Sequence, residues 1–172
     1  MNGVLEGIRL LKGSEVDILA DGSLDYPDEV LADLDFVVAS VHSRFNMETK
    51  EMTERIVKAV ANPHVNVLAH PTGRLLLSRE SYALNVEEII EAARKYNVVI
   101  ELNANPRRLD LDWRHLRRVK EAGVKVAISP DAHRVEGFSD MVYGIGMARK
   151  GWLEAGDVIN TMSAEDLLHL TL

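Results

Sequence analysis

Cysteine is absent from the 172 residues of this chain. Disulfides, zinc sites built on thiolates and cysteine nucleophiles are therefore excluded. The sequence also lacks an apolar run of about 18 residues or more, so no membrane-spanning segment and no membrane partner are predicted. The first residues, MNGVLEGIRLL, have neither the basic start nor the long apolar stretch of a signal peptide. We therefore expect a cytoplasmic location.

Positive charge is the second scarcity. Twenty lysines and arginines face 27 aspartates and glutamates, which gives a formal net charge of −7. Proteins that bind duplex DNA on their own neutralise many phosphates, so this chain is not predicted to be one of them. An acidic balance suits a domain that binds cations, and it leaves room for a local basic rim. The apolar fraction of 47% predicts a folded chain, and its length predicts one domain over residues 1–172.

Short apolar runs alternate with amphipathic helical stretches along the chain. The predicted strands are Ile8–Leu11 continuing to Val16–Leu19, Phe36–Val41, Val65–Ala69, Val98–Leu102 and Val124–Ile128. The predicted helices begin at Pro27, at Thr49 (to Ala61), at Val86 (to Tyr96), at Trp113 (to Ala122, before Gly123) and after Ser163 with Asp166. Repeated strand–helix–strand units indicate an α/β fold with a parallel sheet, either open or part of a barrel. No glycine-rich phosphate loop follows the first strand, which argues against a nucleotide-binding fold.

Polar residues end these strands at regular intervals. Glu15, His42, His70, Glu101 and Asp131 follow one another at separations of 27, 28, 31 and 30 residues. Each separation is about the length of one βα unit. These side chains are therefore expected at one edge of the sheet, the carboxyl-terminal edge, where βα barrels form their active sites.

The residue types at this edge predict a metal site. Imidazole and carboxylate ligands suit zinc, manganese or iron. Two histidines, one glutamate and a water complete a tetrahedral catalytic zinc site. The predicted ligands are Glu15, His42, His70, Asp131 and His133, with His42, His70 and Asp131 as the catalytic residues. Five ligands exceed the needs of one ion, so a second metal is expected.

Several of these residues also have a structural interpretation. Glu15 could pair with a lysine or arginine instead of a metal. Asp17 lies on the same face of an extended strand as Glu15, where it could support a ligand or form a plain salt bridge. Asn103 shares a face with Glu101 and could hold a water, hold a substrate oxygen or cap a turn.

Arginines follow the same strand ends. They are Arg44, Arg74, Arg107, Arg108 and Arg134. Guanidinium groups match the geometry of phosphate oxygens. We therefore predict a phosphorylated substrate, bound by Arg44, Asn103, Arg107 and Arg134.

Five motifs in order resemble the PHP (polymerase and histidinol phosphatase) superfamily, and in particular the C-terminal PHP domain of bacterial and archaeal family X DNA polymerases. They are Gly13–Asp17, Ser40–His42, Ala69–Pro71, Glu101–Asn103 and Ser129–His133. The resemblance covers nearly the whole chain. It implies a distorted (β/α)7 TIM-like barrel with three metals at its carboxyl-terminal face, Glu15 bridging two of them. It also implies a metal-dependent 3′–5′ exonuclease or phosphoesterase of DNA repair, acting on a DNA 3′ end through a parent polymerase.

The start of the sequence departs from the family pattern. Family members begin with a His-x-His strand end, a further histidine and an Asp-His strand end, and nothing similar precedes Glu15 here. We therefore expect a truncated PHP domain that lacks about the first two βα units. Glu15, His42 and His70 would form its one intact site, so we expect fewer metals than in a full domain and low or no activity. The open sheet edges of such a barrel would favour self-association.

Two other functions stay open. One is a small-molecule phosphatase of the histidinol-phosphatase kind. The other is a non-catalytic structural or docking remnant. A metal-dependent amidohydrolase is disfavoured, because no lysine ends a strand where a carbamylated ligand would lie.

Overall fold

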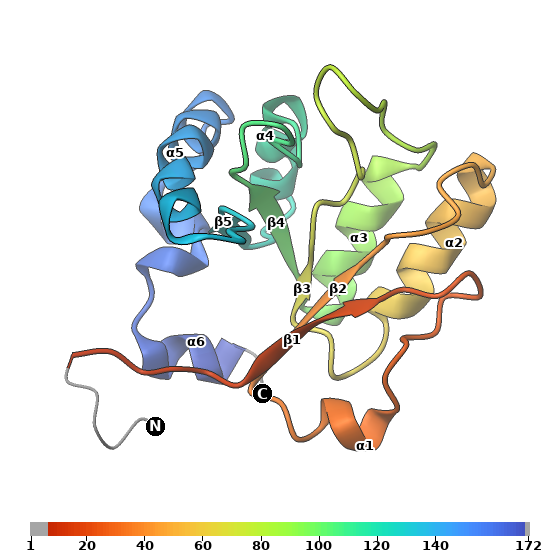
Figure 1. Ribbon diagram of the computed structural model, residues 1–172, viewed down its shortest axis with the longest axis horizontal. Helices are drawn as coiled ribbons and strands as arrows, with labels where there is room; N and C mark the ends of the chain where they lie inside the picture. Colours follow the sequence, from red (N-terminus) through yellow and green to blue (C-terminus); the bar gives the residue numbers. More distant parts are fainter. Residues whose placement is uncertain (1–6, 171–172) are drawn as a thin grey trace.

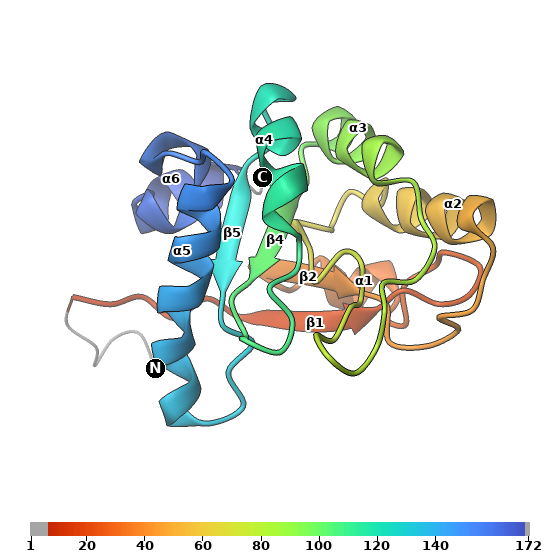
Figure 2. The same ribbon diagram turned by 90° about the horizontal axis from the view of Figure 1, so that it is seen from above.

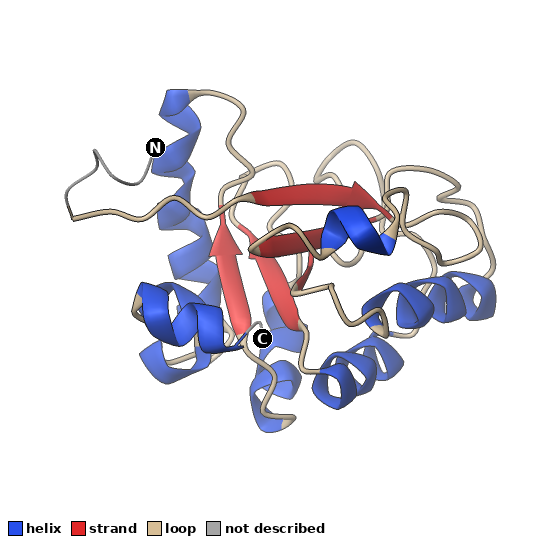
Figure 3. Cartoon of the chain, turned by 90° about the horizontal axis from the view of Figure 1, so that it is seen from below, coloured by secondary structure: helices blue, strands red, loops and turns tan. Residues whose placement is uncertain are grey.

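The apolar runs form five parallel strands in the computed structural model, which describes residues 7–170. The strands are β1 (Gly13–Asp17), β2 (Phe36–Ser40), β3 (Val67–Leu68), β4 (Val99–Asn103) and β5 (Val126–Ser129). Their order across the sheet is β1-β2-β3-β4-β5, the same as along the chain. Figure 3 shows the strand direction turning from β1 to β5, which is the twist expected of a parallel sheet. The α/β class predicted from the sequence is confirmed.

Helices connect these strands. They are α1 (Asp28–Leu31), α2 (Thr49–Val60), α3 (Val86–Tyr96), α4 (Trp113–Glu121), α5 (Met141–Lys150) and α6 (Ala164–Leu170), with short 3-10 turns η2 (Val135–Asp140), η3 (Ala155–Asp157) and η4 (Ile159–Thr161). Figures 1 and 2 show α2, α3, α4 and α5 following one another around one side of the sheet. Among the helices that the structure describes, none has both the length and the apolar character needed to cross a lipid bilayer.

The two faces of the sheet carry separate apolar clusters. On the face covered by α2, α3 and α4, Ala39 and Leu102 belong to one buried cluster with Ile56, Ile90 and Leu116 of these helices. Successive strand residues point to opposite faces, so the neighbouring positions form the second cluster. Its members are Val67, Val99, Ala127 and Ile159, with Leu167 and Leu170 of α6 packed against them. This second face leads to the strand ends where the polar residues lie.

Most predicted elements are confirmed, but several boundaries are wrong, among them those of β3 and β5. The helix Val86–Tyr96 has the predicted ends, and Gly123 follows α4 with a φ of +75°. The segment Ile8–Leu11 is not a strand, and its apolar side chains are poorly covered, with Ile8 61% and Leu10 45% exposed. Pro27 precedes α1 as its N-cap, where it was expected to be the first helical residue. Residues 1–6, part of the stretch tested for a signal peptide, lie outside the described residues.

Helix α5 was not predicted. Its sequence, MVYGIGMARK, contains two glycines, which are poor helix formers. The structure explains one of them. A Cβ added to Gly144 would lie 2.6 Å from both the Ala104 Cβ and the Ile128 Cγ2, so α5 lies against β4 and β5 only without a side chain there. The glycine serves close packing, which local propensity does not reveal.

Candidate metal centre

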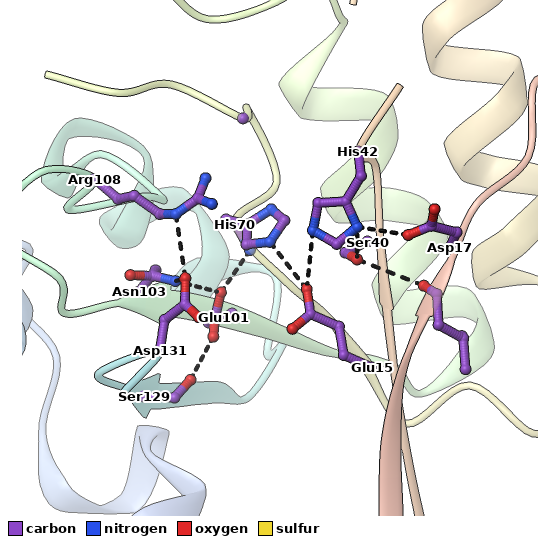
Figure 4. A network of polar contacts seen from close by, with 12 residues as sticks. Glu15, Asp17, Ser40, His42, His70, Glu101, Asn103, Arg108, Ser129 and Asp131 are labelled. Carbon is purple, nitrogen blue, oxygen red and sulfur yellow. Dashed lines mark hydrogen bonds and ion pairs between the residues drawn. The ribbon is translucent and has the colours of Figure 1, made fainter. Parts of the chain in front are cut away.

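Three predicted ligands converge at the carboxyl-terminal edge of the sheet. Glu15 belongs to β1, while His42 and His70 follow the ends of β2 and β3. The Glu15 Oε1 lies 3.3 Å from the His42 Nε2 and 3.1 Å from the His70 Nε2. One donor atom from each residue lies within 4.8 Å of the other two. Figure 4 shows the two imidazole rings directed at the Glu15 carboxylate. Two imidazoles and one carboxylate at this spacing fit a single zinc, manganese or iron ion.

Asp17 orients the ring of His42. The Asp17 Oδ1 lies 2.5 Å from the His42 Nδ1, and the Ser40 Oγ lies 3.3 Å from the same nitrogen. These contacts leave the His42 Nε2 directed at Glu15. Metal-binding histidines usually hold their second nitrogen in this way. Of the two roles considered for Asp17, the structure shows the contact to a candidate ligand.

His70 is held from its main chain. It is only 2% exposed, and its backbone N–H donates to the Glu101 Oε2 over 2.6 Å. Its φ of +27° turns the ring toward Glu15 directly after β3. The His70 Nδ1 is buried and has no hydrogen-bond partner among the described residues. Unlike the second nitrogen of His42, this ring nitrogen is not held by a neighbouring side chain, so the backbone and the contact with Glu15 position the ring.

Glu15 and His42 shift each other's proton affinity, and His70 adds to the effect on Glu15. Hydrogen bonds from His42 and then His70 hold the pKa of Glu15 far below its usual range. The hydrogen bond to Glu15, with that to Asp17 adding to it against the effect of burial, raises the pKa of His42 to about 9. At neutral pH the pair is thus an imidazolium and a carboxylate. A metal ion would take the place of the proton on His42 and keep the attraction to Glu15.

Asp131 and His133 lie apart from this group. The Asp131 Oδ2 lies 3.2 Å from the Arg108 Nε and accepts a hydrogen bond from the Asn103 Nδ2 over 3.3 Å. The His133 side chain is 86% exposed, and its Nδ1 lies 2.9 Å from the backbone oxygen of Asp131. Asp131 nevertheless lines the same cavity as Glu15 and His70.

Glu101 supports the loop that carries His70. Its carboxylate is 5% exposed, and it accepts hydrogen bonds from the His70 backbone, from Asn103 and from the Ser129 hydroxyl. Burial raises the pKa of this carboxyl group. Asn103, predicted as a substrate contact, is fully buried and directs its amide at Glu101 and Asp131. Both residues link the ends of β3, β4 and β5.

The structure separates the arginines that sequence spacing had grouped together. Arg44, Arg107 and Arg134 are exposed, and none of them forms an ion pair with a described residue. Arg74 pairs with Asp112 and so serves the fold of its loop. Arg108, which the sequence does not predict as a substrate contact, reaches Asp131, and Asp131 lines the same cavity as Glu15 and His70. The Arg108 side chain is 17% exposed, and its Nη1 is buried with no described partner. Nothing in the spacing distinguishes it from its neighbour Arg107.

A cavity of about 580 Å³ connects the candidate centre to the second apolar cluster. Its polar end is formed by Ser14, Glu15, His70, Glu101, Ser129 and Asp131. Its apolar part is formed by Leu11, Phe36, Val38, Val67, Ala127, Ile128, Ile159 and Leu167. A pocket with apolar walls and a few convergent polar groups is the usual form of a ligand site.

No family model matches the sequence. Comparison with known proteins finds similar sequences of two kinds, a DNA polymerase/exonuclease and probable phosphatases. Over 167 residues, or 97% of the chain, the sequence is 48% identical to the DNA polymerase/3'-5' exonuclease PolX of Bacillus subtilis (strain 168), and it covers 29% of that protein. It is 33% identical over 139 residues, or 75% of the chain, to a probable phosphatase of Thermoanaerobacter sp. (strain X514), covering 54% of it. A probable phosphatase of Acetivibrio thermocellus is 34% identical over 139 residues, which are 76% of this chain and 55% of the relative. The chain thus spans under a third of the polymerase and about half of each phosphatase.

Proposed function

This chain belongs to the PHP superfamily and is of the type found in family X DNA polymerases, and from this premise we propose that it is a metal-dependent phosphoesterase domain. The observation that carries the proposal is the convergence of Glu15, His42 and His70. Two relatives support it, since one is named for exonuclease activity and the other as a probable phosphatase. Both names describe the hydrolysis of phosphate esters.

Each residue of the site has a proposed task. Glu15, His42 and His70 would hold a divalent ion, either zinc or manganese, with iron as a further candidate. Such an ion, when bound, supplies Lewis acidity toward a phosphoryl oxygen or a water. Asp17 keeps the His42 Nε2 aimed at the site. Arg108 has a free buried Nη1 for an anionic oxygen of the substrate.

Asp131 and His133 are proposed as ligands for a further metal, as the family pattern implies. For this, Asp131 would exchange its contact with Arg108 for the ion. The exposed Arg44, Arg107 and Arg134 would then contact the substrate from the rim of the pocket.

The order of the strands supports a proposal for the complete fold. Strands in chain order with consecutive helices side by side are the arrangement of a TIM-like barrel, and we propose that this sheet is a part of one. Residues 1–172 would then form one PHP unit. Strand β1 is an edge strand of the described sheet, and its outer edge before Asp17 could pair with a second copy of the chain.

For the substrate we propose the 3′ end of a DNA strand, in keeping with the name of the polymerase relative. The phosphatase relatives support a second candidate, a small phosphomonoester of the histidinol phosphate kind. A remnant that serves only for docking would hydrolyse neither.

The test is hydrolysis by the manganese-loaded and the zinc-loaded chain. We expect metal-dependent release of nucleotides from a single-stranded oligonucleotide, and loss of that activity in His42→Ala. Hydrolysis of p-nitrophenyl phosphate alone would favour the small-molecule phosphatase. Activity that persists in His42→Ala would contradict the proposed site, and the absence of both activities in a metal-loaded chain would favour the docking remnant.

Metal binding should strengthen as the pH rises. The pKa of His42 is raised from 6.5 to about 9, so at neutral pH the ion must displace a proton. We expect the apparent affinity for manganese to rise about tenfold per pH unit between about pH 7 and 9 and to level off above. In the metal-free chain, protonation of His42 stabilises the fold fully below pH 6.5, and this contribution is lost as the pH rises through 9.

Calorimetric titrations at several pH values would measure this dependence. Asp17→Asn provides the comparison, because Asp17 helps Glu15 to raise the pKa of His42. In this variant the rise in affinity should level off at a lower pH. An affinity that does not change between pH 7 and 9 would show that His42 binds no metal.

A further inference from the structure

The loop between β3 and α3 ends in an exposed apolar tip. Leu77 is fully exposed, at 109%, and its neighbour Leu76 is 39% exposed. In Figure 1 this yellow-green loop rises at the top of the view, above α3. Leu77 also has a φ of +63°, a backbone conformation that residues other than glycine rarely adopt. The leucine therefore contributes neither packing nor an easy turn, and the fold alone does not explain it.

The tip is held in place by a fixed framework. Leu75 and Arg79 exchange two backbone hydrogen bonds of 2.8 and 2.7 Å across the loop. The Leu76 N–H donates to the backbone oxygen of Arg107 over 2.6 Å. The Arg79 guanidinium lies 4.2 Å above the ring of Phe45. A tip with this many anchors presents its side chain at a defined position.

Positive charge surrounds the tip. The loop encloses a hollow of about 580 Å³ lined by Arg74, Leu75, Leu76, Leu77, Ser78, Arg79, Glu80, Ser81 and Arg114. Three arginines and one glutamate line the hollow, and Asp112 pairs with two of the arginines, so these five groups together carry +1, whereas the chain as a whole carries −7. Arg74 and Arg114 share the carboxylate of Asp112. Arg79 donates to the Gly73 backbone oxygen through Nε and Nη2 and has no carboxylate partner among the described residues, so its charge is not neutralised. The local charge complements a polyanion.

One residue connects this hollow to the candidate metal centre. The backbone oxygen of Arg108 accepts a hydrogen bond from the Arg74 Nε over 2.9 Å. The side chain of the same residue reaches the other way, to Asp131 in the metal pocket. A polyanionic strand with its end in the pocket could therefore continue over the β3–α3 loop.

We infer that the β3–α3 loop binds a single-stranded nucleic acid whose end occupies the metal pocket, with Leu77 inserted between two neighbouring bases and Arg79 facing the backbone phosphates. The inference rests on the proposed function and adds to it a binding surface outside the metal pocket. Proteins that bind duplex DNA insert leucine and other apolar side chains between neighbouring bases, and a single strand offers the same space between its bases with less stacking to disrupt. A small phosphomonoester has no second base or phosphate and would leave the loop unused.

The test compares Leu77→Gly with Trp152→Gly. Glycine suits both positions, since Trp152 has a φ of +67° and is likewise exposed, at 71%. Trp152 follows α5 beside the end of α4 and serves as the control. The probe is a single-stranded oligonucleotide of about 12 nucleotides that carries 2-aminopurine near its 3′ end. Anisotropy reports binding, and 2-aminopurine fluorescence reports unstacking.

We expect the wild-type chain to raise the 2-aminopurine fluorescence, and Leu77→Gly to weaken binding about tenfold and remove that rise. Trp152→Gly should behave as wild type, and Arg79→Gln should reduce the salt dependence of binding. Equal binding by wild type and Leu77→Gly would overturn the inference. So would Leu77-dependent binding to anionic lipid vesicles without binding to the oligonucleotide. Failure of the wild-type chain to hydrolyse any phosphoester would instead count against the proposed function.

Discussion

Glu15→Gln is expected to weaken metal binding by more than about 100-fold and to abolish metal-dependent phosphoesterase activity. Glu15 supplies the one carboxylate of the three-residue group, and both imidazoles direct their Nε2 atoms at it. The amide of glutamine has almost the same shape but no negative charge. The variant therefore removes the attraction to a cation and keeps the packing.

Calorimetric titration with manganese measures the loss, and a thermal melt of the metal-free variant shows whether the fold persists. Glu29→Gln on α1 is the matched control, since it removes an exposed carboxylate outside the group. Its metal affinity should equal that of the wild type. Tight metal binding by Glu15→Gln would place the ion elsewhere, for example at Asp131 and His133.

Gly73→Ala is expected to lower the free energy of unfolding by about 3 kcal/mol. A Cβ at this position would lie 2.3 Å from the Tyr82 Cε1. The Tyr82 ring cannot easily retreat, because its hydroxyl donates to the Pro71 backbone oxygen and its face stacks on Phe45. The glycine φ of +61° adds the strain that any L side chain would have there. The loss should appear as a lower midpoint of urea unfolding.

Gly123→Ala separates the two causes. Gly123 has a φ of +75°, yet a Cβ there would meet nothing within 4 Å. This variant should lose only about 1 kcal/mol, the contribution of backbone strain alone. Equal losses in the two alanine variants would show that Tyr82 moves aside without penalty. Because Gly73 follows His70 by three residues, the larger loss should be accompanied by weaker metal binding.

The sequence predicted the architecture from patterns that are local. Apolar runs and helical periodicity depend on near neighbours, so β2 and α3 were placed within a residue or two. Helix α5 was not predicted, because Gly144 is explained only by contacts with Ala104 and Ile128, which lie far away in the chain. The length of β3 was overestimated, since only Val67 and Leu68 of the predicted Val65–Ala69 pair as a strand.

The candidate site shows the same division. Spacing by βα units predicted that Glu15, His42 and His70 would meet, because parallel strands bring their ends to one edge. Spacing could not distinguish Arg108 from Arg107, since one residue in a loop reverses the direction of a side chain. The hydrogen bonds that hold the loop around Leu77 could not be predicted either, because one of them joins the β3–α3 loop to Arg107.

The backbone conformation of two predicted ligands affects which substitutions the site would accept during evolution. His70 and Asp131 both have positive φ, at +27° and +52°, directly beyond strand ends. Glycine would relax either position, whereas histidine and aspartate are among the few side chains that tolerate this region at all. Stability and ligand chemistry thus oppose each other at these two positions. A chain released from its activity would drift toward glycine there, whereas a chain still under selection for activity would keep the strained residues.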